Sequence, residues 1–187
     1  MKTTQVTPEE SFLLQSHALV ECVANLQKME VTNDPDFRDL KIKVYGQTAT
    51  IMTQGGGTVF GGQGALISAF YTFLVLPLEW KRRRVGSFEK LDLSEPEKIA
   101  NSRAEVGPNG DTYPRKNQAL RHFRNALAHA RIGWSSGGKL IVEDSDPSSN
   151  AKYIAEYSME SLGELLQSLN MAIAIYVDEE IKPRKLK

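Results

Sequence analysis

Apolar residues at helical spacing constrain the fold of this chain more than any other feature of its sequence. Near the C-terminus, apolar side chains recur every three or four residues after a serine that can cap a helix. This spacing places them on one face of an α-helix, so it predicts a long final helix that begins at Ser158 or Ser161. The apolar positions of this helix are Leu162, Leu165, Leu166, Leu169, Ile173 and Val177.

The N-terminal segment predicts another long helix. Thr7 suits the cap position, Pro8 suits the first helical position, and Glu10 completes a capping box with Thr7. Apolar residues then continue at helical spacing to about Glu30. They are Phe12, Leu19, Val23, Leu26 and Met29.

The segment between these two helices predicts further helices. Residues 66–80 are mostly apolar and predict a buried core helix, which ends near the basic run at 81–84. Residues 94–97 carry a capping signature and open a short helix to about residue 104. Residues 37–51 fit a helix, although part of this segment also alternates like a strand.

Two glycine clusters lie within residues 54–64 and precede the predicted core helix. A glycine-rich loop before a helix can bind phosphate, but no Gly-Lys-Ser/Thr follows and no clear strand precedes it. We therefore interpret this segment as a loop between helices.

Short strands are predicted between residue 130 and the last helix. Residues 131–134 and 140–142 are expected to form a hairpin, and residues 153–157 alternate like a third strand. Residues 107–110 read as a turn. We expect a mainly all-α fold, with a small β-hairpin or three-stranded sheet before the last helix. The chain is interpreted as a single domain over 1–187, with a core of about 7–181, a loop at 54–64, a hairpin at 131–143 and a basic tail at 182–187.

Composition excludes several classes of protein. Lysine plus arginine and aspartate plus glutamate number 23 each, so net charge predicts no partner. The single cysteine, Cys22, excludes a disulfide within the chain and a thiolate metal cluster. The N-terminus lacks the apolar core of a signal peptide, and the most apolar segment is short for a membrane span. We expect a cytoplasmic protein that does not bind membranes.

The segment from Pro114 to Ala130 predicts the helix that carries the chemistry. At about 100° per residue, its apolar side chains fall on one arc, which is expected to face the core. This arc contains Ala119, Leu120, Phe123, Ala126, Leu127 and Ala130. The opposite arc contains Arg121, His122, Arg124, Asn125 and His129.

Charge and residue type suggest what this polar arc can do. Residues 112–142 contain six lysine or arginine residues and no aspartate or glutamate, so the segment should attract phosphate. Histidine can transfer a proton near neutral pH, and arginine presents a fork of donors to phosphate oxygens. The lack of carboxylates argues against a two-metal nuclease or a glycosidase, and we expect neither a metal nor a cofactor. A solvated helix face without function is the alternative reading.

The run from His122 to Ile132 resembles the signature of the HEPN family. The closest likeness lies in Arg124-Asn125-Ala126-Leu127-Ala128-His129, an arginine followed by a polar residue and closed by a histidine. The order of the predicted elements is also similar, with long helices before this motif, a hairpin after it and a long last helix.

The resemblance implies an all-α bundle that forms a homodimer, with the motifs of both chains around one cleft. Its catalytic members are metal-independent ribonucleases of toxin–antitoxin, defence and RNA-processing systems. Carried over, Arg124 and His129 are the catalytic pair and Asn125 is their polar neighbour. Ala130 stands where a glycine often follows the histidine. Glu79 is a candidate for the acidic residue that assists from an earlier helix in some members.

We therefore expect an endoribonuclease that uses the RNA 2′-hydroxyl, with Arg121, His122 and Arg131 as substrate-binding residues. His122 has further readings, as a second catalytic imidazole or as a hydrogen-bonded interface residue. The alternative function is a non-catalytic module that binds RNA or a nucleotide, or dimerises, with a partner protein. A toxin silenced by an antitoxin or a nucleotidyltransferase is a third possibility.

Overall fold

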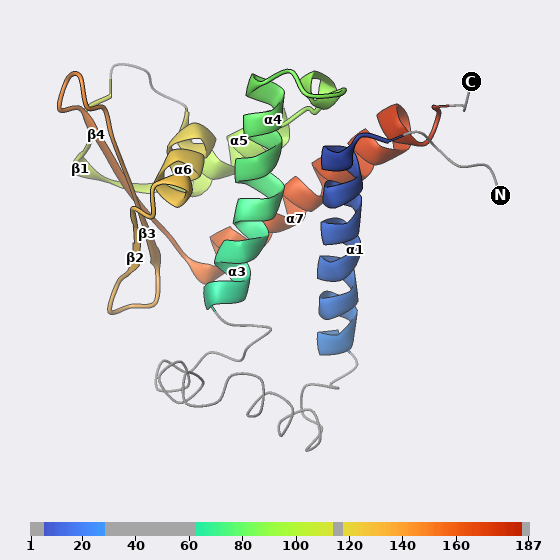
Figure 1. Ribbon diagram of the computed structural model, residues 1–187. Helices are drawn as coiled ribbons and strands as arrows, with labels where there is room; N and C mark the ends of the chain where they lie inside the picture. Colours follow the sequence, from blue (N-terminus) through green and yellow to red (C-terminus); the bar gives the residue numbers. More distant parts are fainter. Residues whose placement is uncertain (1–5, 29–62, 114–117, 185–187) are drawn as a thin grey trace.

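The computed structural model describes residues 6–28, 63–113 and 118–184 (Figure 1). The helix expected over 37–51 lies outside the described residues. The glycine-rich loop also lies outside them, except for its last two positions, which begin a helix.

The described residues form a set of helices and a small sheet, one face of which is covered by α6 (Ala119–Ala128). The helices are α1 (Pro8–Lys28), α3 (Gln63–Phe70), η2 (Tyr71–Val75), α4 (Leu76–Arg82), η3 (Phe88–Lys90), α5 (Ser94–Arg103), α6 (Ala119–Ala128), α7 (Met159–Tyr176) and η4 (Val177–Ile181). The strands are β1 (Glu105–Asp111), β2 (Ile132–Trp134), β3 (Leu140–Ser145) and β4 (Lys152–Tyr157). None of the helices in the described ranges is both long enough and apolar enough to cross a membrane.

Two of the three predicted helix caps are present; the third, at residues 94–97, is not formed, because α5 begins at Ser94 with Leu93 as its N-cap and no side-chain cap. The backbone N–H of Thr7 donates to Glu10 Oε2 at 3.0 Å, and the N–H of Glu10 donates to Thr7 Oγ1 at 3.2 Å. This reciprocal pair is the capping box expected from the sequence. At the start of α7, the N–H of Ser161 donates to Ser158 Oγ at 3.1 Å, so Ser158 is the cap.

The buried helix predicted over 66–80 is confirmed, and it is continuous through α3, η2 and α4. Its central segment η2 is a π-helical turn, in which the N–H of Leu76 bonds to the carbonyl of Tyr71. A π turn widens the helix locally and shifts the register of its faces. Phe70, Phe73 and Leu74 share one face of this helix and are all buried.

The expected all-α class is wrong, because the protein contains a four-stranded antiparallel sheet in the order β1-β4-β3-β2. The predicted hairpin (β2 and β3) and third strand (β4) are present, and β3 pairs with β4 along its whole length. The fourth strand, β1, replaces the turn that we expected at 107–110. The fold is therefore mixed α and β.

Strand β1 is not predicted from the sequence, because it contains Gly107, Pro108 and Gly110, and these residue types normally interrupt strands. Its pairing with β4 is irregular between Val106 and Asp111, as in a β-bulge. Gly110 allows the two strands to approach, since a Cβ atom there would lie 2.7 Å from the carbonyl oxygen of Ile154. The glycine thus belongs to the strand pairing and does not mark a turn.

Replacing Gly110 with alanine is expected to lower the free energy of unfolding by about 1–3 kcal/mol, because β1 or β4 must shift to accept the methyl group. Urea denaturation of the two proteins measures this loss. Gly107→Ala is the matched control, since a Cβ atom at that position meets nothing within 4 Å. Equal stability of the two variants would contradict the close approach at Gly110.

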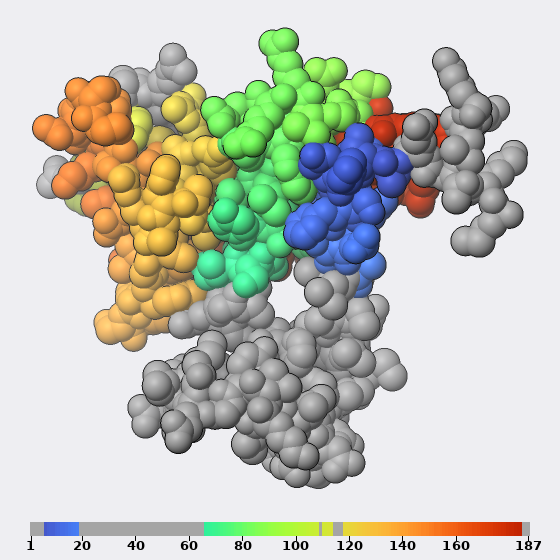
Figure 2. All heavy atoms as spheres, viewed as in Figure 1, coloured from blue at the N-terminus to red at the C-terminus, as the bar shows by residue number. Residues whose placement is uncertain are grey.

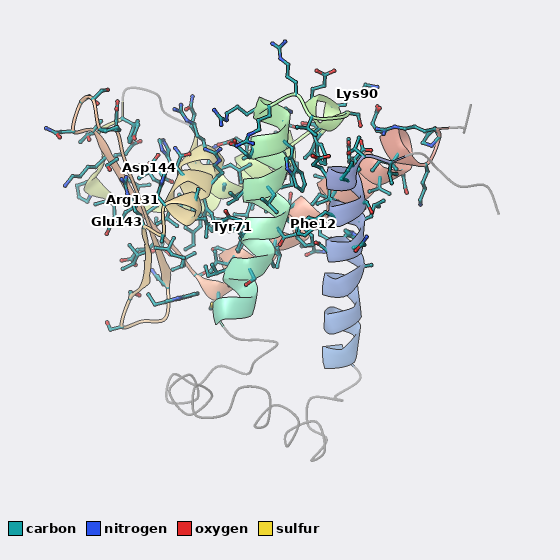
Figure 3. All side chains as sticks on the ribbon, viewed as in Figure 1. Phe12, Tyr71, Lys90, Arg131, Glu143 and Asp144 are labelled. Carbon is teal, nitrogen blue, oxygen red and sulfur yellow. The ribbon has the colours of Figure 1, made fainter. Side chains whose placement is uncertain are left out.

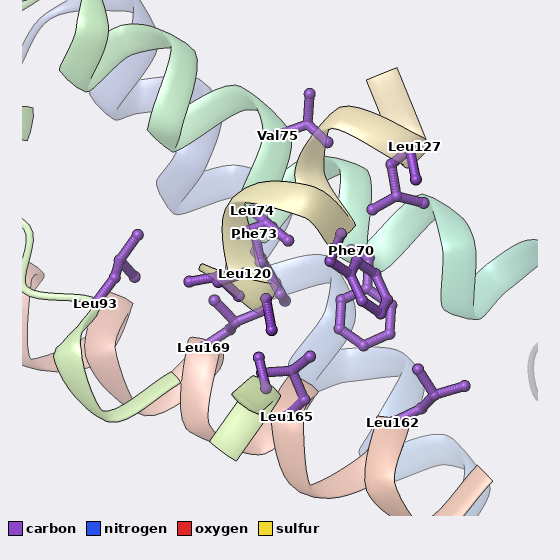
Figure 4. Packing of buried hydrophobic residues seen from close by; sticks show 14 of the residues in the cluster. Phe70, Phe73, Leu74, Val75, Leu93, Leu120, Leu127, Leu162, Leu165 and Leu169 are labelled. Atoms are coloured by element: carbon purple, nitrogen blue, oxygen red, sulfur yellow. The ribbon is translucent and has the colours of Figure 1, made fainter. Parts of the chain in front are cut away.

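The core lies where α6 is packed between the sheet and the α3–α4 helix (Figure 1). Figure 4 shows its buried side chains on α6, on the α3–α4 helix and on α7. Phe123 of α6 joins the two sides, because its ring centroid lies 4.9 Å from that of Phe70 and 5.2 Å from that of Tyr157 on β4. Buried leucines of α7, including Leu165 and Leu169, complete this core. Helix α6 is thus fixed on two sides, and its remaining faces are determined by that packing.

A buried carboxylate joins the beginning of the described chain to its end. Glu10 on α1 is 0% exposed and accepts hydrogen bonds from both terminal nitrogens of Arg184, at 2.7 and 2.9 Å. The hydroxyls of Tyr176 and Ser87 each donate to the same carboxylate at 3.0 Å. This cluster anchors α1 to the end of α7 and to the loop after α4.

Candidate functional site

The motif helix α6 is shorter than expected, and its two edges have different neighbours. It begins at Ala119 and ends at Ala128, while residues 114–117 of the expected helix lie outside the described residues. The predicted apolar arc faces the core except for Ala130, which is exposed and lies beyond the end of the helix. Helix α6 lies between the sheet and the α3–α4 helix (Figure 2).

Arg124 lies on the edge that faces α4. Its Nη2 donates to Glu79 Oε2 at 2.8 Å, and its Nη1 donates to Asn125 Oδ1 at 2.8 Å. The Arg124 side chain is 22% exposed, so it is held in place while still reaching the surface. Glu79, which the family resemblance suggested as an assisting acid, is therefore in contact with the motif.

The Glu79 carboxylate forms ion pairs with three arginines, of which Arg124 is one. Arg82 and Arg83, from the basic run after the core helix, also donate to its carboxylate, at 2.6 and 2.7 Å. These hydrogen bonds from Arg82 and Arg83 lower the pKa of Glu79 to about 2. One negative charge faces three positive ones, so the surface beside α6 has a local excess of positive charge that favours anions.

His122 lies on the opposite edge, and its expected exposure is wrong. It is 2% exposed and lies between the rings of Tyr153 and Tyr113, at centroid distances of 4.3 and 4.5 Å. On the helix it is only about 40° from Ala126, so it borders the apolar arc, and the sheet covers it. Direct contact of His122 with a substrate is therefore not available in this conformation.

Asn125 connects the two edges. Its Nδ2 donates to Asp144 Oδ2 at 3.0 Å, and the same oxygen bonds to His122 Nδ1 at 2.9 Å. A continuous chain of hydrogen bonds thus runs across α6, from His122 on one side to Glu79 on the other. Asn125 and Arg124 are the two motif residues in this chain.

Asp144 is the residue that sequence reading missed. It continues the alternation of β3 after Leu140 and Val142, and all three are buried. An acidic residue at an inward position of a strand requires a polar partner in the interior. Extending the predicted strand beyond Val142 would have revealed this signal.

His129 caps the C-terminal end of α6 and is exposed. Its backbone N–H bonds to the carbonyl of Asn125 at 3.0 Å. Among the residues that the structure describes, its imidazole forms no hydrogen bond or ion pair, with Arg124 or with any other residue. The exposed ring is accessible to water and to a bound molecule.

Arg121 and Arg131 are both exposed. Arg121 donates to Gln118 Oε1 at 2.8 Å. Arg131, which is labelled in Figure 3, donates to Ser145 Oγ at 2.6 Å. Neither arginine is paired with an acid among the described residues, so both charges remain available to an anion. Within those residues, no group of three or more His, Cys, Asp or Glu side chains is arranged to hold a metal ion.

Ala130 follows His129 in a conformation that favours glycine. Its φ is +52°, and two backbone hydrogen bonds close the helix, from Ala130 to Leu127 at 3.2 Å and from Arg131 to Ala126 at 2.8 Å. This is the Schellman arrangement, in which the residue after the cap is usually glycine. The departure from the family pattern at this position therefore strains the backbone beside His129.

Replacing Ala130 with glycine is expected to raise the free energy of unfolding by about 0.5–1 kcal/mol, because it removes the left-handed strain. Urea denaturation measures the gain. Ala128→Gly provides the control of opposite sign, since Ala128 is helical and glycine there should cost about 1 kcal/mol. A loss of stability in both variants would contradict the strain at Ala130.

Comparison with known protein families identifies the family of this chain. A family model described as HEPN pEK499 p136 matches residues 1–180 of the chain, which include α6 and all four strands. No curated protein and no solved structure matches the chain significantly.

Proposed function

Because the chain belongs to the HEPN pEK499 p136 family, we propose that it is a metal-independent endoribonuclease of a toxin or defence system. Membership is consistent with a nucleotide-binding or ribonuclease-like function. The observation that carries the proposal is that one motif supplies an anchored guanidinium, Arg124 on α6, and an exposed imidazole without a partner among the described residues, His129 at the C-cap of that helix.

In the proposed reaction, the ribose 2′-oxygen attacks the adjacent phosphorus and the bond from phosphorus to the 5′-oxygen breaks. His129 accepts the proton of the 2′-hydroxyl or donates one to the leaving 5′-oxygen. Arg124 stabilises the charge that builds on the phosphorane oxygens. The products are a 2′,3′-cyclic phosphate and a 5′-hydroxyl. A homodimer would bring a second imidazole for the other proton transfer.

The surrounding arginines would bind the RNA backbone. Arg121 and Arg131 lie on either side of His129 in the sequence, and Arg82 and Arg83 lie beside Arg124. Because phosphate contacts release counterions, RNA binding should weaken steeply as the salt concentration rises.

One observation favours the alternative, a non-catalytic module that binds RNA or a nucleotide with a partner protein such as an antitoxin or a nucleotidyltransferase. Both terminal nitrogens of Arg124 already donate to protein groups, Asn125 and Glu79. An arginine with these contacts can serve structure alone. RNA binding without turnover would support this reading.

The proposal is tested by incubating the purified protein with mixed RNA in EDTA and identifying the ends of the products. Cleavage to cyclic phosphate and 5′-hydroxyl ends is expected, and DNA should remain intact because it lacks the attacking hydroxyl. Arg124→Lys should reduce cleavage, because lysine cannot present the guanidinium fork. Arg103→Lys is the matched control, since Arg103 also donates two hydrogen bonds to a glutamate, Glu164, on a different pair of helices.

Cleavage that disappears in EDTA, or that is equal in the Arg124→Lys and Arg103→Lys variants, would overturn the proposal.

A further inference from the structure

Asp144 is a buried acid to which the proposed reaction gives no role. It is 5% exposed, it lies on β3 beside α6, and its carboxylate faces the motif (Figure 3). The neighbouring acid on the same strand, Glu143, is exposed. The alternation of the strand thus separates two acids of equal charge, one inside and one outside.

One oxygen of Asp144 accepts two hydrogen bonds. Oδ2 lies 2.9 Å from His122 Nδ1 and 3.0 Å from Asn125 Nδ2. When Asp144 is a carboxylate it only accepts hydrogen bonds, and His122 then donates to it from Nδ1. The Asn125 amide donates from Nδ2, so its NH₂ is oriented towards Asp144.

That orientation determines what Asn125 offers to Arg124. With its NH₂ on Asp144, the amide presents Oδ1 to Arg124 Nη1, at 2.8 Å. If the amide were turned over, two donors would face each other, and the guanidinium would lose this contact. Glu79 holds the other terminal nitrogen of Arg124.

We propose that Asp144 is a positioning residue, which acts through Asn125 to hold the Arg124 guanidinium in the orientation that a scissile phosphate requires. This inference rests on the proposed ribonuclease function. The two tyrosine rings around His122 fix the imidazole, and the imidazole helps to fix Asp144. The sheet thereby sets the geometry of the motif helix.

The first experiment compares Asp144→Ala with Glu143→Ala. Both substitutions remove one negative charge from β3, so they change the local potential in a similar way. Asp144→Ala is expected to lower kcat for RNA cleavage by at least about tenfold, with KM changed by less than about threefold, because misoriented catalytic groups slow the reaction. Glu143→Ala should leave both constants within about twofold of the parent values.

Two further variants separate positioning from simple loss of structure. Asp144→Asn keeps an acceptor oxygen in place of Oδ2, so it should recover most of the lost kcat. Combining Asp144→Ala with Asn125→Ala should lower kcat no further than Asn125→Ala alone, because the effect passes through Asn125. A kcat of Asp144→Ala no lower than that of Glu143→Ala would overturn the inference, as would additive losses in the double variant.

A measurement on the unsubstituted protein covers the case in which Asp144→Ala does not fold. Nitrogen-15 NMR of the His122 ring should show the proton on Nδ1, and the Asn125 NH₂ should exchange slowly with water. A proton on Nε2 alone would overturn the inference. If the unsubstituted protein does not cleave RNA, the proposed function fails, and the NMR result still decides whether Asp144 orients Asn125.

Discussion

Replacing His129 with alanine is expected to lower the rate of RNA cleavage by about 10²–10⁴-fold, the range that general acid–base catalysis contributes. The same substitution should leave the melting temperature nearly unchanged, because the imidazole is exposed and has no partner among the described side chains. Cleavage assays in EDTA and thermal unfolding of the same preparation measure the two effects together.

His129→Gln distinguishes proton transfer from binding. Glutamine keeps a polar side chain that can contact RNA, but it does not titrate near neutral pH. Both variants should therefore be inactive, while their affinity for RNA blocked at the 2′-hydroxyl stays close to that of the parent protein. Activity in His129→Gln at the parent rate would exclude His129 as an acid or a base.

Replacing Glu10 with glutamine is expected to lower the free energy of unfolding by about 3 kcal/mol, which is the largest loss of stability predicted for this chain. Glu10 is fully buried, and Arg184 would lose the charge that two of its nitrogens contact. Urea denaturation at neutral pH measures the loss. Glu95→Gln is the control, because the ion pair of Glu95 with Lys98 is exposed and should contribute little.

Lowering the pH should weaken the ion pair between Glu10 and Arg184. Burial raises the pKa of the Glu10 carboxyl, but hydrogen bonds from Arg184, Thr7, Tyr176 and Ser87 lower this pKa by more than burial raises it. The resulting pKa is about 2. Since this pKa is below the ordinary value of 4.5, the ionised carboxylate stabilises the fold fully above about pH 4.5. That stability is lost as the pH falls from about 4.5 towards 2.

The difference in stability between the parent protein and Glu10→Gln should therefore shrink across this acid range. A difference that is the same at pH 7 and pH 3 would contradict the lowered pKa of Glu10.

The helical periodicity and the helix caps at Thr7 and Ser158 can be predicted from the sequence, because they depend on residues within four positions of each other. The Thr7–Glu10 capping box, the Ser158 cap and the apolar arc of α6 are all local features of this kind. Strand β1 was not readable, because its pairing with β4 depends on residues about 45 positions away. Its glycines and proline locally favour a turn.

The candidate site was predictable in its residues but not in its contacts. The motif identified Arg124, Asn125 and His129, since they lie within six positions of each other. The periodicity of one helix does not reveal which element covers each edge, so it placed His122 in solvent. It also does not reveal that Glu79 and Asp144, which lie outside residues 112–142, contact the two sides of α6.

The Glu10 cluster has a consequence for the order of events during synthesis. Helix α1 is made before its partners, because the Tyr176 hydroxyl and the Arg184 guanidinium that bind its buried acid are 166 and 174 positions further along the chain. Until those residues have left the ribosome, docking of α1 would bury a charge without its arginine. The helix must therefore wait for Arg184 before it can dock fully.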